Sequence, residues 1–269
     1  MRVAVAGARG RMGGTILRLA CNDPQLEVAG AFERADHPDV GRLLSDLAGL
    51  PLDGMRLEGK TANVLGACDV VIDFTTPQAT LQHLRSAVQA HRAMVIGTTG
   101  FERSAEGELA KAARRIGIVK APNMSAGVTL LFSLVERAAQ LLPSDCDVEI
   151  VEVHHRNKKD APSGTALELA RRVARARGAE LSRVALYGRS GITGARKAGV
   201  IGIHAVRGGD VVGEHTVSFL ADGERLEFTH RAASREAFAR GALAAAKFVA
   251  ARKRGLFSME DVLLEGRKP

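Results

Sequence analysis

Residues 2–13, RVAVAGARGRMG, join a short apolar run to a glycine-rich turn and the first residues of an amphipathic segment. The run at 2–6 has the length of a buried strand, and residues 12–21 have helical spacing. A strand followed at once by glycines and a helix lets backbone N–H groups and the helix start approach a pyrophosphate. The stretch therefore predicts a dinucleotide-binding turn, with a purely structural turn as the alternative. Its spacing is GxxGxxG rather than the more common GxGxxG.

The same alternation of strand and helix continues through the first 120 residues. Further apolar strand candidates lie at 27–33, 69–74, 93–96 and 117–120. Residues 78–90 and 104–115 between them have helical spacing. Such alternation indicates βαβ units and a Rossmann-like parallel sheet, whose ligands gather at the carboxyl ends of the strands.

After Pro122 the pattern changes. A long helix is expected over 125–142, followed by strand candidates at 147–155, 200–206, 211–220 and 225–231. Short glycine-containing turns between the later strands favour an antiparallel or mixed sheet. A final helix at 235–251 carries an alanine-rich stripe that suits packing back onto the first part. We therefore expect an α/β protein in which 1–123 plus 235–269 form the dinucleotide-binding domain and 124–234 a second, α+β domain.

Composition argues against several classes of protein. The net charge of +8 would suit a nucleic-acid binder, but Lys and Arg are dispersed along the chain, and aromatic residues make up only 4% of it. No apolar run reaches about 18 residues, and the start of the chain lacks the pattern of a secretory signal. Cys21, Cys68 and Cys146 form no CxxC pair. We expect a cytoplasmic protein without a nucleic-acid or membrane partner and without a structural disulfide.

Two features suit the ends of a bound dinucleotide. Glu33 ends the second strand candidate, where an acidic side chain accepts hydrogen bonds from ribose hydroxyls, and Arg34 beside it suits a 2′-phosphate. The alternative is an exposed charge pair. Turns at 97–100 and 121–124 end later strands and should border the same crevice. The expected cofactor is NADPH or NADH.

The segment 152–165, EVHHRNKKDAPSGT, concentrates proton donors and positive charge just before a helix. On an extended strand His154 and His155 point to opposite faces, so one should face a substrate more directly. The helix start at Ser163 offers free N–H groups and the positive end of a dipole to a carboxylate, although simple N-capping is the alternative. Two adjacent histidines lack a third ligand at zinc spacing, and no metal is expected.

Together these motifs resemble the dihydrodipicolinate reductase family over essentially the whole chain. The resemblance is carried by HHRNKKDAPSGTA at 154–166, by VRGGDVVGEHT at 206–216 and by GLFSM at 255–259, beside the glycine turn. It implies reduction of 4-hydroxy-tetrahydrodipicolinate to tetrahydrodipicolinate with NAD(P)H and loss of water, in lysine biosynthesis via diaminopimelate. It also implies that residues 124–234 bind this small dicarboxylate substrate and assemble a homotetramer.

The resemblance also implies roles for single residues. His154 becomes the proton donor and acceptor, and Lys158 a second proton donor. Substrate is bound by His155, Gly164 and Thr165. Cofactor is bound by Gly7, Ala8, Arg9, Gly10, Arg11, Met12, Glu33, Arg34, Gly97, Thr98, Thr99, Ala121, Pro122, Asn123 and Met124. Asn157 and Lys159 depart from the family's usual residues but leave the proposed acids in place.

Two other functions stay open at this point. A non-catalytic NAD(P)-sensing protein could use the same fold, but it would need no acid cluster. A reductase of another small dicarboxylate would need the same cluster, because the position of a motif does not identify a substrate.

Overall fold

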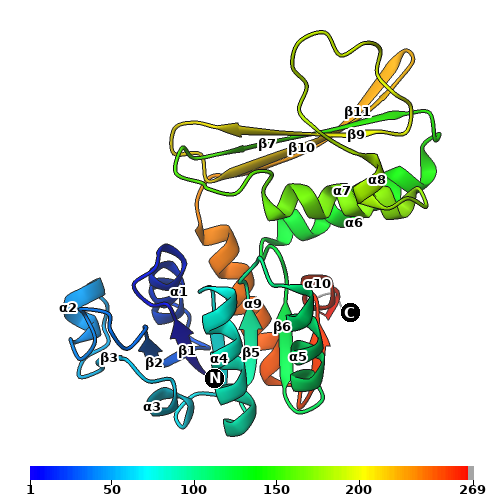
Figure 1. Cartoon of the computed structure of the whole chain (residues 1–269). Coiled ribbons are helices and arrows are strands. Elements are labelled where there is room, and N and C mark those ends of the chain that lie inside the picture. Colours follow the sequence, from blue (N-terminus) through cyan, green and yellow to red (C-terminus); the bar gives the residue numbers. More distant parts are fainter. Residues whose placement is uncertain (266–269) are drawn as a thin grey trace. The chain divides into compact units, whose positions relative to one another are not determined.

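The computed structural model describes residues 1–265 (Figure 1). Contacts divide the chain into two units, Met1–Ala126 with the residues from Arg235 onward, and Gly127–Ser234. The first unit is discontinuous in sequence, because the whole of the second unit lies between two of its segments.

A seven-stranded parallel sheet forms the centre of the first unit, in the order β12-β6-β5-β4-β1-β2-β3. Its strands are β1 (Arg2–Ala6), β2 (Glu27–Phe32), β3 (Leu57–Glu58), β4 (Val70–Asp73), β5 (Ala93–Ile96), β6 (Gly117–Lys120) and β12 (Gly255–Phe257). The helices are α1 (Arg11–Cys21), α2 (Leu44–Ala48), α3 (Ala62–Leu65), α4 (Pro77–Ala90), α5 (Arg103–Ala113), α9 (Glu236–Ala250) and α10 (Met259–Glu265). Strand order reverses between β1 and β4, where sheets of this type bind their ligands.

Successive side chains along the strands point to opposite faces of this sheet, and each face has its own apolar core. Val3 and Val5 of β1 pack in one core with side chains of α1 and α9. Ala4 and Ala6 face the other way, into a core shared with α3, α4 and α5. A parallel sheet buried on both faces needs such continuous apolar strands, which explains the clear strand pattern in the sequence.

The second unit contains a five-stranded mixed sheet in the order β11-β10-β7-β9-β8. Its strands are β7 (Asp147–His154), β8 (Ala185–Tyr187), β9 (Ile201–Arg207), β10 (Gly213–Ala221) and β11 (Glu224–Ala232). Its helices are α6 (Ala126–Leu141), α7 (Gly164–Ala176) and α8 (Leu181–Val184). Helices α6 and α7 cover one face, and their buried side chains share a core with Val148 and Ile150 of β7 (Figure 1).

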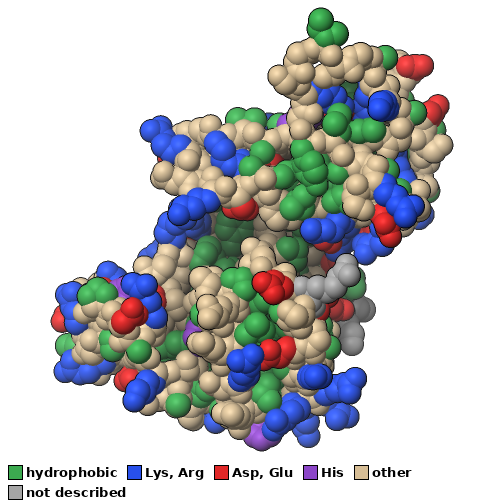
Figure 2. Space-filling model, in the orientation of Figure 1, with side chains coloured by type: hydrophobic (Ala, Val, Ile, Leu, Met, Phe, Trp, Pro, Cys, Tyr) green, Lys and Arg blue, Asp and Glu red, His purple; other side chains and the backbone are tan. Residues whose placement is uncertain are grey.

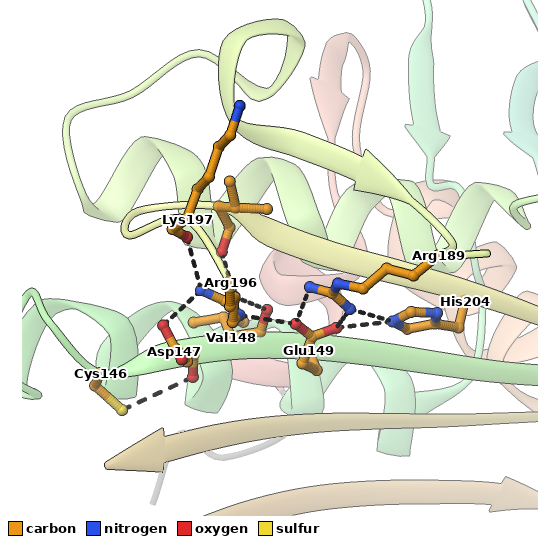
Figure 3. A network of polar contacts seen from close by, with 9 residues as sticks. Cys146, Asp147, Val148, Glu149, Arg189, Arg196, Lys197 and His204 are labelled. Carbon is orange, nitrogen blue, oxygen red and sulfur yellow. Dashed lines mark hydrogen bonds and ion pairs between the residues drawn. The ribbon is translucent and has the colours of Figure 1, made fainter. Parts of the chain in front are cut away.

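The opposite face of this sheet carries a network of charges (Figure 3). Glu149 of β7 accepts hydrogen bonds from Arg189 at 2.7 Å and from Arg196 at 3.0 Å, and it contacts His204 Nε2 at 2.7 Å. Both arginines belong to the irregular segment between β8 and β9. One carboxylate therefore anchors this long loop at two points.

The predicted fold class, a Rossmann-like parallel sheet with a second α+β domain, is confirmed. The candidates at 2–6, 93–96 and 117–120 match β1, β5 and β6 at both ends. Consecutive strands β9 and β10 are not neighbours, because β7 lies between them in the sheet.

Charged side chains are spread over the surface. Figure 2 shows Lys and Arg scattered among acidic and apolar side chains on the face in view, without one basic tract. Among residues 1–265, no helix has both the length and the apolar character needed to span a bilayer.

Candidate active site

The turn after β1 is a glycine-rich loop whose backbone packs closely against the start of α1. Gly7 has φ +66°, which glycine adopts without strain, and its N–H donates to the carbonyl oxygen of Phe32 at 2.9 Å. Gly10 N–H donates to the carbonyl oxygen of Gly7 at 2.9 Å. A Cβ on Gly13 would overlap the backbone of Gly7 and Ala8, so α1 packs against the turn only because residue 13 has no side chain. The start of α1 and this narrow backbone cradle fit a dinucleotide pyrophosphate.

The two charged residues after β2 have different environments. Glu33 Oε1 accepts the backbone N–H of Arg9 at 2.9 Å, which places this carboxylate beside the glycine turn. The Arg9 side chain pairs with Asp39 at 2.8 Å. Arg34 is largely exposed and pairs with the exposed Asp36 at 3.2 Å. Because such surface pairs contribute only about 0–1 kcal/mol, Arg34 can exchange this partner for a phosphate.

A buried aspartate connects the turns after β4 and β5. Asp73 has no exposed surface, and its Oδ1 accepts from the backbone N–H and hydroxyl of Thr75 at 2.9 and 2.6 Å. The Thr80 hydroxyl donates to the Thr98 hydroxyl at 2.8 Å and lies 3.1 Å from the same Oδ1. Asp73 Oδ2 lies 2.7 Å from His83 Nδ1. These contacts fix the predicted cofactor residue Thr98 relative to the end of β4.

Close backbone approaches shape the next two turns. A Cβ on Gly97 would overlap the ring of Phe74, and a Cβ on Gly241 of α9 would overlap the carbonyl oxygen of Met124. Ala121 is buried, and its N–H donates to the carbonyl oxygen of Ile96 at 3.2 Å. The 121–124 turn is therefore held between β5 and α9.

The predicted cofactor-binding residues follow β1, β2, β5 and β6, and parallel strands bring these turns to one edge of the sheet. Sequence reasoning gave no role to Thr80 or His83. An aspartate at the end of a buried strand, with threonine two residues later, was the available signal for this network.

In the second unit a buried carboxylate lies near the end of β7. Glu152 has no exposed surface, and four donors surround its two oxygens. Oε1 accepts the backbone N–H of Ser163 at 2.9 Å and Arg207 Nη2 at 2.7 Å. Oε2 accepts Arg207 Nη1 at 2.8 Å and lies 2.5 Å from His154 Nδ1. Burial by itself would raise the pKa of Glu152, but the bonds from His154, Arg207 and Ser163 lower it to about 2.

The imidazole of His154 lies between this carboxylate and a second histidine. The ring packs edge-on against that of His215, with centroids 5.1 Å apart. Burial, and then the neighbouring His154, lowers the pKa of His215 to about 3, so His215 is neutral near pH 7. A Cβ on Gly213 would lie 2.9 Å from His154 Nε2. Glycine at 213 therefore leaves room for this nitrogen.

The loop after β7 holds the second predicted acid. Lys158 Nζ pairs with Asp160 at 2.9 Å, and the Lys158 side chain is 20% exposed. The backbone N–H of Lys158 donates to the carbonyl oxygen of His155 at 3.1 Å, and His155 N–H donates to Val211 at 2.7 Å. Burial raises the pKa of Asp160, but Lys158 outweighs this effect and lowers it overall.

Helix α7 begins at Gly164 with Ser163 as its N-cap. The Ser163 hydroxyl accepts the N–H of Ala166 at 3.2 Å and lies 3.1 Å from His215 Nε2. Thr165, a predicted substrate residue, is buried in the first turn. The sequence assigns no role to Arg207, His215 or Gly213, because their contacts with residues 152–165 are made only in the folded sheet. It assigns none to Glu152 either, although strand alternation places Glu152 on the same face as His154.

Among the described residues, no group of three or more His, Cys, Asp or Glu side chains is arranged to hold a metal ion.

Two family models match the chain. The model "Dihydrodipicolinate reductase, N-terminus" matches residues 1–124, and "Dihydrodipicolinate reductase, C-terminus" matches 127–263. The chain belongs to the dihydrodipicolinate reductase family. The 4-hydroxy-tetrahydrodipicolinate reductases of Methylococcus capsulatus and Nitrosomonas eutropha are each 49% identical to this family member over 263 residues, 98% of both chains.

One solved structure agrees with this assignment to the dihydrodipicolinate reductase family. The dipicolinate-bound dihydrodipicolinate reductase from Paenisporosarcina sp. TG-14 is 29% identical, with a TM-score of 0.75 over 97% of this chain and 98% of that one. An amine dehydrogenase from Mycobacterium smegmatis, 16% identical with a TM-score of 0.59 over 97% of this chain and 95% of its own, shows the fold alone.

This dihydrodipicolinate reductase family member is an NAD(P)H-dependent oxidoreductase. The predictions of the family, the enzyme class and the NADH or NADPH cofactor are confirmed. The relatives' names give no support to a non-catalytic sensor.

Proposed function

We propose that this enzyme reduces 4-hydroxy-tetrahydrodipicolinate to tetrahydrodipicolinate with NADH or NADPH and loss of water, in lysine biosynthesis via diaminopimelate. Relatives that share about half of its residues along nearly the whole chain have this name. The observation that carries the proposal is the cluster in the second unit, where His154 and the N-terminus of α7 share one buried carboxylate. A proton donor beside a carboxylate-binding element suits a small dicarboxylate.

The first unit supplies the cofactor site. The glycine turn receives the pyrophosphate, Glu33 accepts hydrogen bonds from the ribose, and Arg34 pairs with the 2′-phosphate of NADPH. The turns at 97–99 and 121–124 border the nicotinamide half. The full set is Gly7, Ala8, Arg9, Gly10, Arg11, Met12, Glu33, Arg34, Gly97, Thr98, Thr99, Ala121, Pro122, Asn123 and Met124. The bound nicotinamide supplies a hydride, and the protein supplies orientation and electrostatic field.

The second unit binds the substrate and moves protons. The N–H groups of Gly164 and Thr165, with the positive end of the α7 dipole, bind one carboxylate, and His155 binds the substrate from the loop. Loss of the 4-hydroxyl as water needs an acid at that oxygen, and hydride addition to the ring builds negative charge that a proton discharges. His154 and Lys158 supply these two protons, and His154, as donor and acceptor, takes back the proton that dehydration releases from the ring carbon beside the hydroxyl. Overall, one hydride and one proton replace the hydroxyl with hydrogen and release water.

The roles divide along the chain. Residues 1–123 plus 235–269 bind the dinucleotide, and 124–234 bind the substrate and assemble a homotetramer. The open face of the second sheet supports this assembly, because Val151 and Val206 are exposed there. The free cysteines Cys21, Cys68 and Cys146 suit a cytoplasmic enzyme.

The test follows NADPH and NADH oxidation by absorbance, with the condensation product of pyruvate and aspartate semialdehyde as substrate. Wild type should turn over, and Lys158→Ala should lose most of the rate while still binding the cofactor. Product identification by mass spectrometry completes the assay. Intact cofactor binding without turnover would overturn the proposed substrate and direct attention to another dicarboxylate.

A further inference from the structure

The hydrogen bonds of Glu152 determine the tautomer of His154. With its pKa lowered to about 2, Glu152 is ionised near neutral pH and can only accept hydrogen bonds. Its 2.5 Å contact with His154 Nδ1 therefore requires the proton on Nδ1. In the neutral imidazole the other nitrogen, Nε2, then carries the lone pair. This is the nitrogen for which Gly213 leaves room.

The same carboxylate holds the start of α7. Its other oxygen, Oε1, accepts the backbone N–H of Ser163, the N-cap residue. The Ser163 side chain is held in turn between Ala166 N–H and the neutral His215. A displacement of Glu152 would therefore move the imidazole and the helix start together.

Arg207 compensates the buried negative charge of Glu152 and connects it to the loop that holds Lys158. Its two terminal nitrogens form a bidentate pair with Glu152, which compensates a charge that would otherwise be buried alone. Arg207 Nη2 also donates to the carbonyl oxygen of Asp160 at 2.7 Å, and the Asp160 carboxylate holds Lys158. The pair thus connects the His154 ring, the start of α7 and the Lys158 loop.

We infer that Glu152 is a positioning residue of this reductase: its carboxylate fixes His154 with Nε2 as the reactive nitrogen and holds the ring in place relative to the start of α7. The inference rests on the proposed function for the roles of His154 and α7. The bonding pattern itself does not depend on the identity of the substrate.

The first test uses histidine side-chain ¹⁵N–¹H NMR on the full-length wild-type protein, with His154→Gln to assign the signal. We expect His154 as the Nδ1–H tautomer when neutral. A predominant Nε2–H tautomer would overturn the inference, whatever the activity of the enzyme.

The second test is Glu152→Gln. The NH2 group of a glutamine side chain donates hydrogen bonds and cannot accept them. Either His154 Nδ1 or the backbone N–H of Ser163 must therefore lose its acceptor. We expect kcat to fall about 100-fold in either orientation, because the ring is no longer held relative to the helix start, with loss of the Nδ1–H signature where the amide nitrogen faces His154 and a roughly tenfold rise in the Kd for dipicolinate where it faces Ser163. NADPH binding should be unchanged.

Glu149→Gln is the matched control. Glu149 lies on the same strand, also contacts arginine and histidine, and likewise has its pKa lowered to about 2 despite partial burial. This variant should leave the His154 spectrum and kcat as in wild type. Equal losses in both variants would show a general stability effect and overturn the inference.

The outcomes separate the two proposals. Wild-type turnover with an unchanged kcat in Glu152→Gln would reject the inference and keep the proposed function. A wild-type Nδ1–H tautomer without turnover of the proposed substrate would reject the function and keep the positioning geometry. If Glu152→Gln does not fold, Arg207→Lys keeps the charge without the bidentate pair, and an unchanged kcat in that variant would reject the inference.

Discussion

At the scale of single residues, two glutamates of β7 have different partners because strand alternation places them on opposite faces of the sheet. Glu149 and Glu152 are three positions apart and so face opposite sides of the sheet. Glu152 lies on the helix-covered face beside His154, whereas Glu149 lies on the open face and anchors the loop through Arg189 and Arg196. The acid cluster is visible in the sequence, but the partner Arg207 is 55 positions away from Glu152 and is set only by sheet register.

The Glu149 network should make stability depend on pH. Burial raises the pKa of Glu149, but Arg189, His204 and Arg196 lower it from 4.5 to about 2. Because the folded pKa lies below the unfolded one, this carboxylate stabilises the fold above pH 4.5, and its contribution is lost as the pH falls toward about 2. Thermal unfolding of Glu149→Gln should show a lower Tm near pH 7 and a shallower loss of Tm in acid than wild type. Parallel Tm curves for the two proteins would contradict this expectation.

Gly213→Ala should disturb the proposed acid directly. The new Cβ would lie 2.9 Å from His154 Nε2, so the ring must move. Displacement of a reacting group by about 1 Å reduces rates by up to about 100-fold, and we expect a fall in kcat of that order in steady-state assays. Gly208→Ala, where a Cβ meets nothing within 4 Å, is the control. Equal kcat values in the two variants would count against the role of this nitrogen.

At the scale of elements, the sequence predicts long, strongly patterned segments well and short ones poorly. Strands such as β5 are continuous apolar runs because both faces of the sheet are buried. Helices α2, α3 and α8 have four or five residues, too few for a helical period to be visible. The insertion of β7 between β9 and β10 is a long-range pairing that no local turn encodes.

Helix α9 depends on a small residue where it meets the first unit's 121–124 turn. Gly241→Ala would place a Cβ on the carbonyl oxygen of Met124, and overpacking of this kind costs about 1–3 kcal/mol. We expect a lower Tm and weaker NADPH binding by titration. Gly107→Ala in α5, where a Cβ meets nothing, should instead raise stability slightly, since glycine is a poor helix former. A Gly241→Ala protein as stable as wild type would show that α9 can shift freely.

At the scale of the molecule, the two units have separate cores and separate chemistry. The first unit carries the glycine turn and the network around Asp73, and the second carries the Glu152 cluster. The glycine turn and the 154–166 motif are local in sequence, so the sequence alone predicts them. Apart from Glu152, the residues that orient them come from distant strands and helices and become visible only in the structure.

The open face of the second sheet should control assembly. Val151 is 37% exposed on β7, on the face opposite α6 and α7. Val151→Arg should shift the proposed tetramer toward smaller species in analytical ultracentrifugation, because an unpaired charge would be buried in the interface. Leu264→Arg, at an exposed position of α10 in the first unit, is the control and should leave the mass unchanged. A tetramer in both variants would place the interface elsewhere.

Because the first unit is discontinuous, one of its segments leaves the ribosome before the second unit and the other leaves after it. The core shared by β1, α1 and α9 includes Ala242 and Leu243, which are synthesised only after all of residues 127–234. During translation the part of the nascent sheet that α9 later covers stays uncovered by α9 until the second unit has emerged. Vectorial synthesis therefore allows the core of the first unit to be completed only after residues 127–234 have been made, so a chain in which that core is complete already contains the whole second unit.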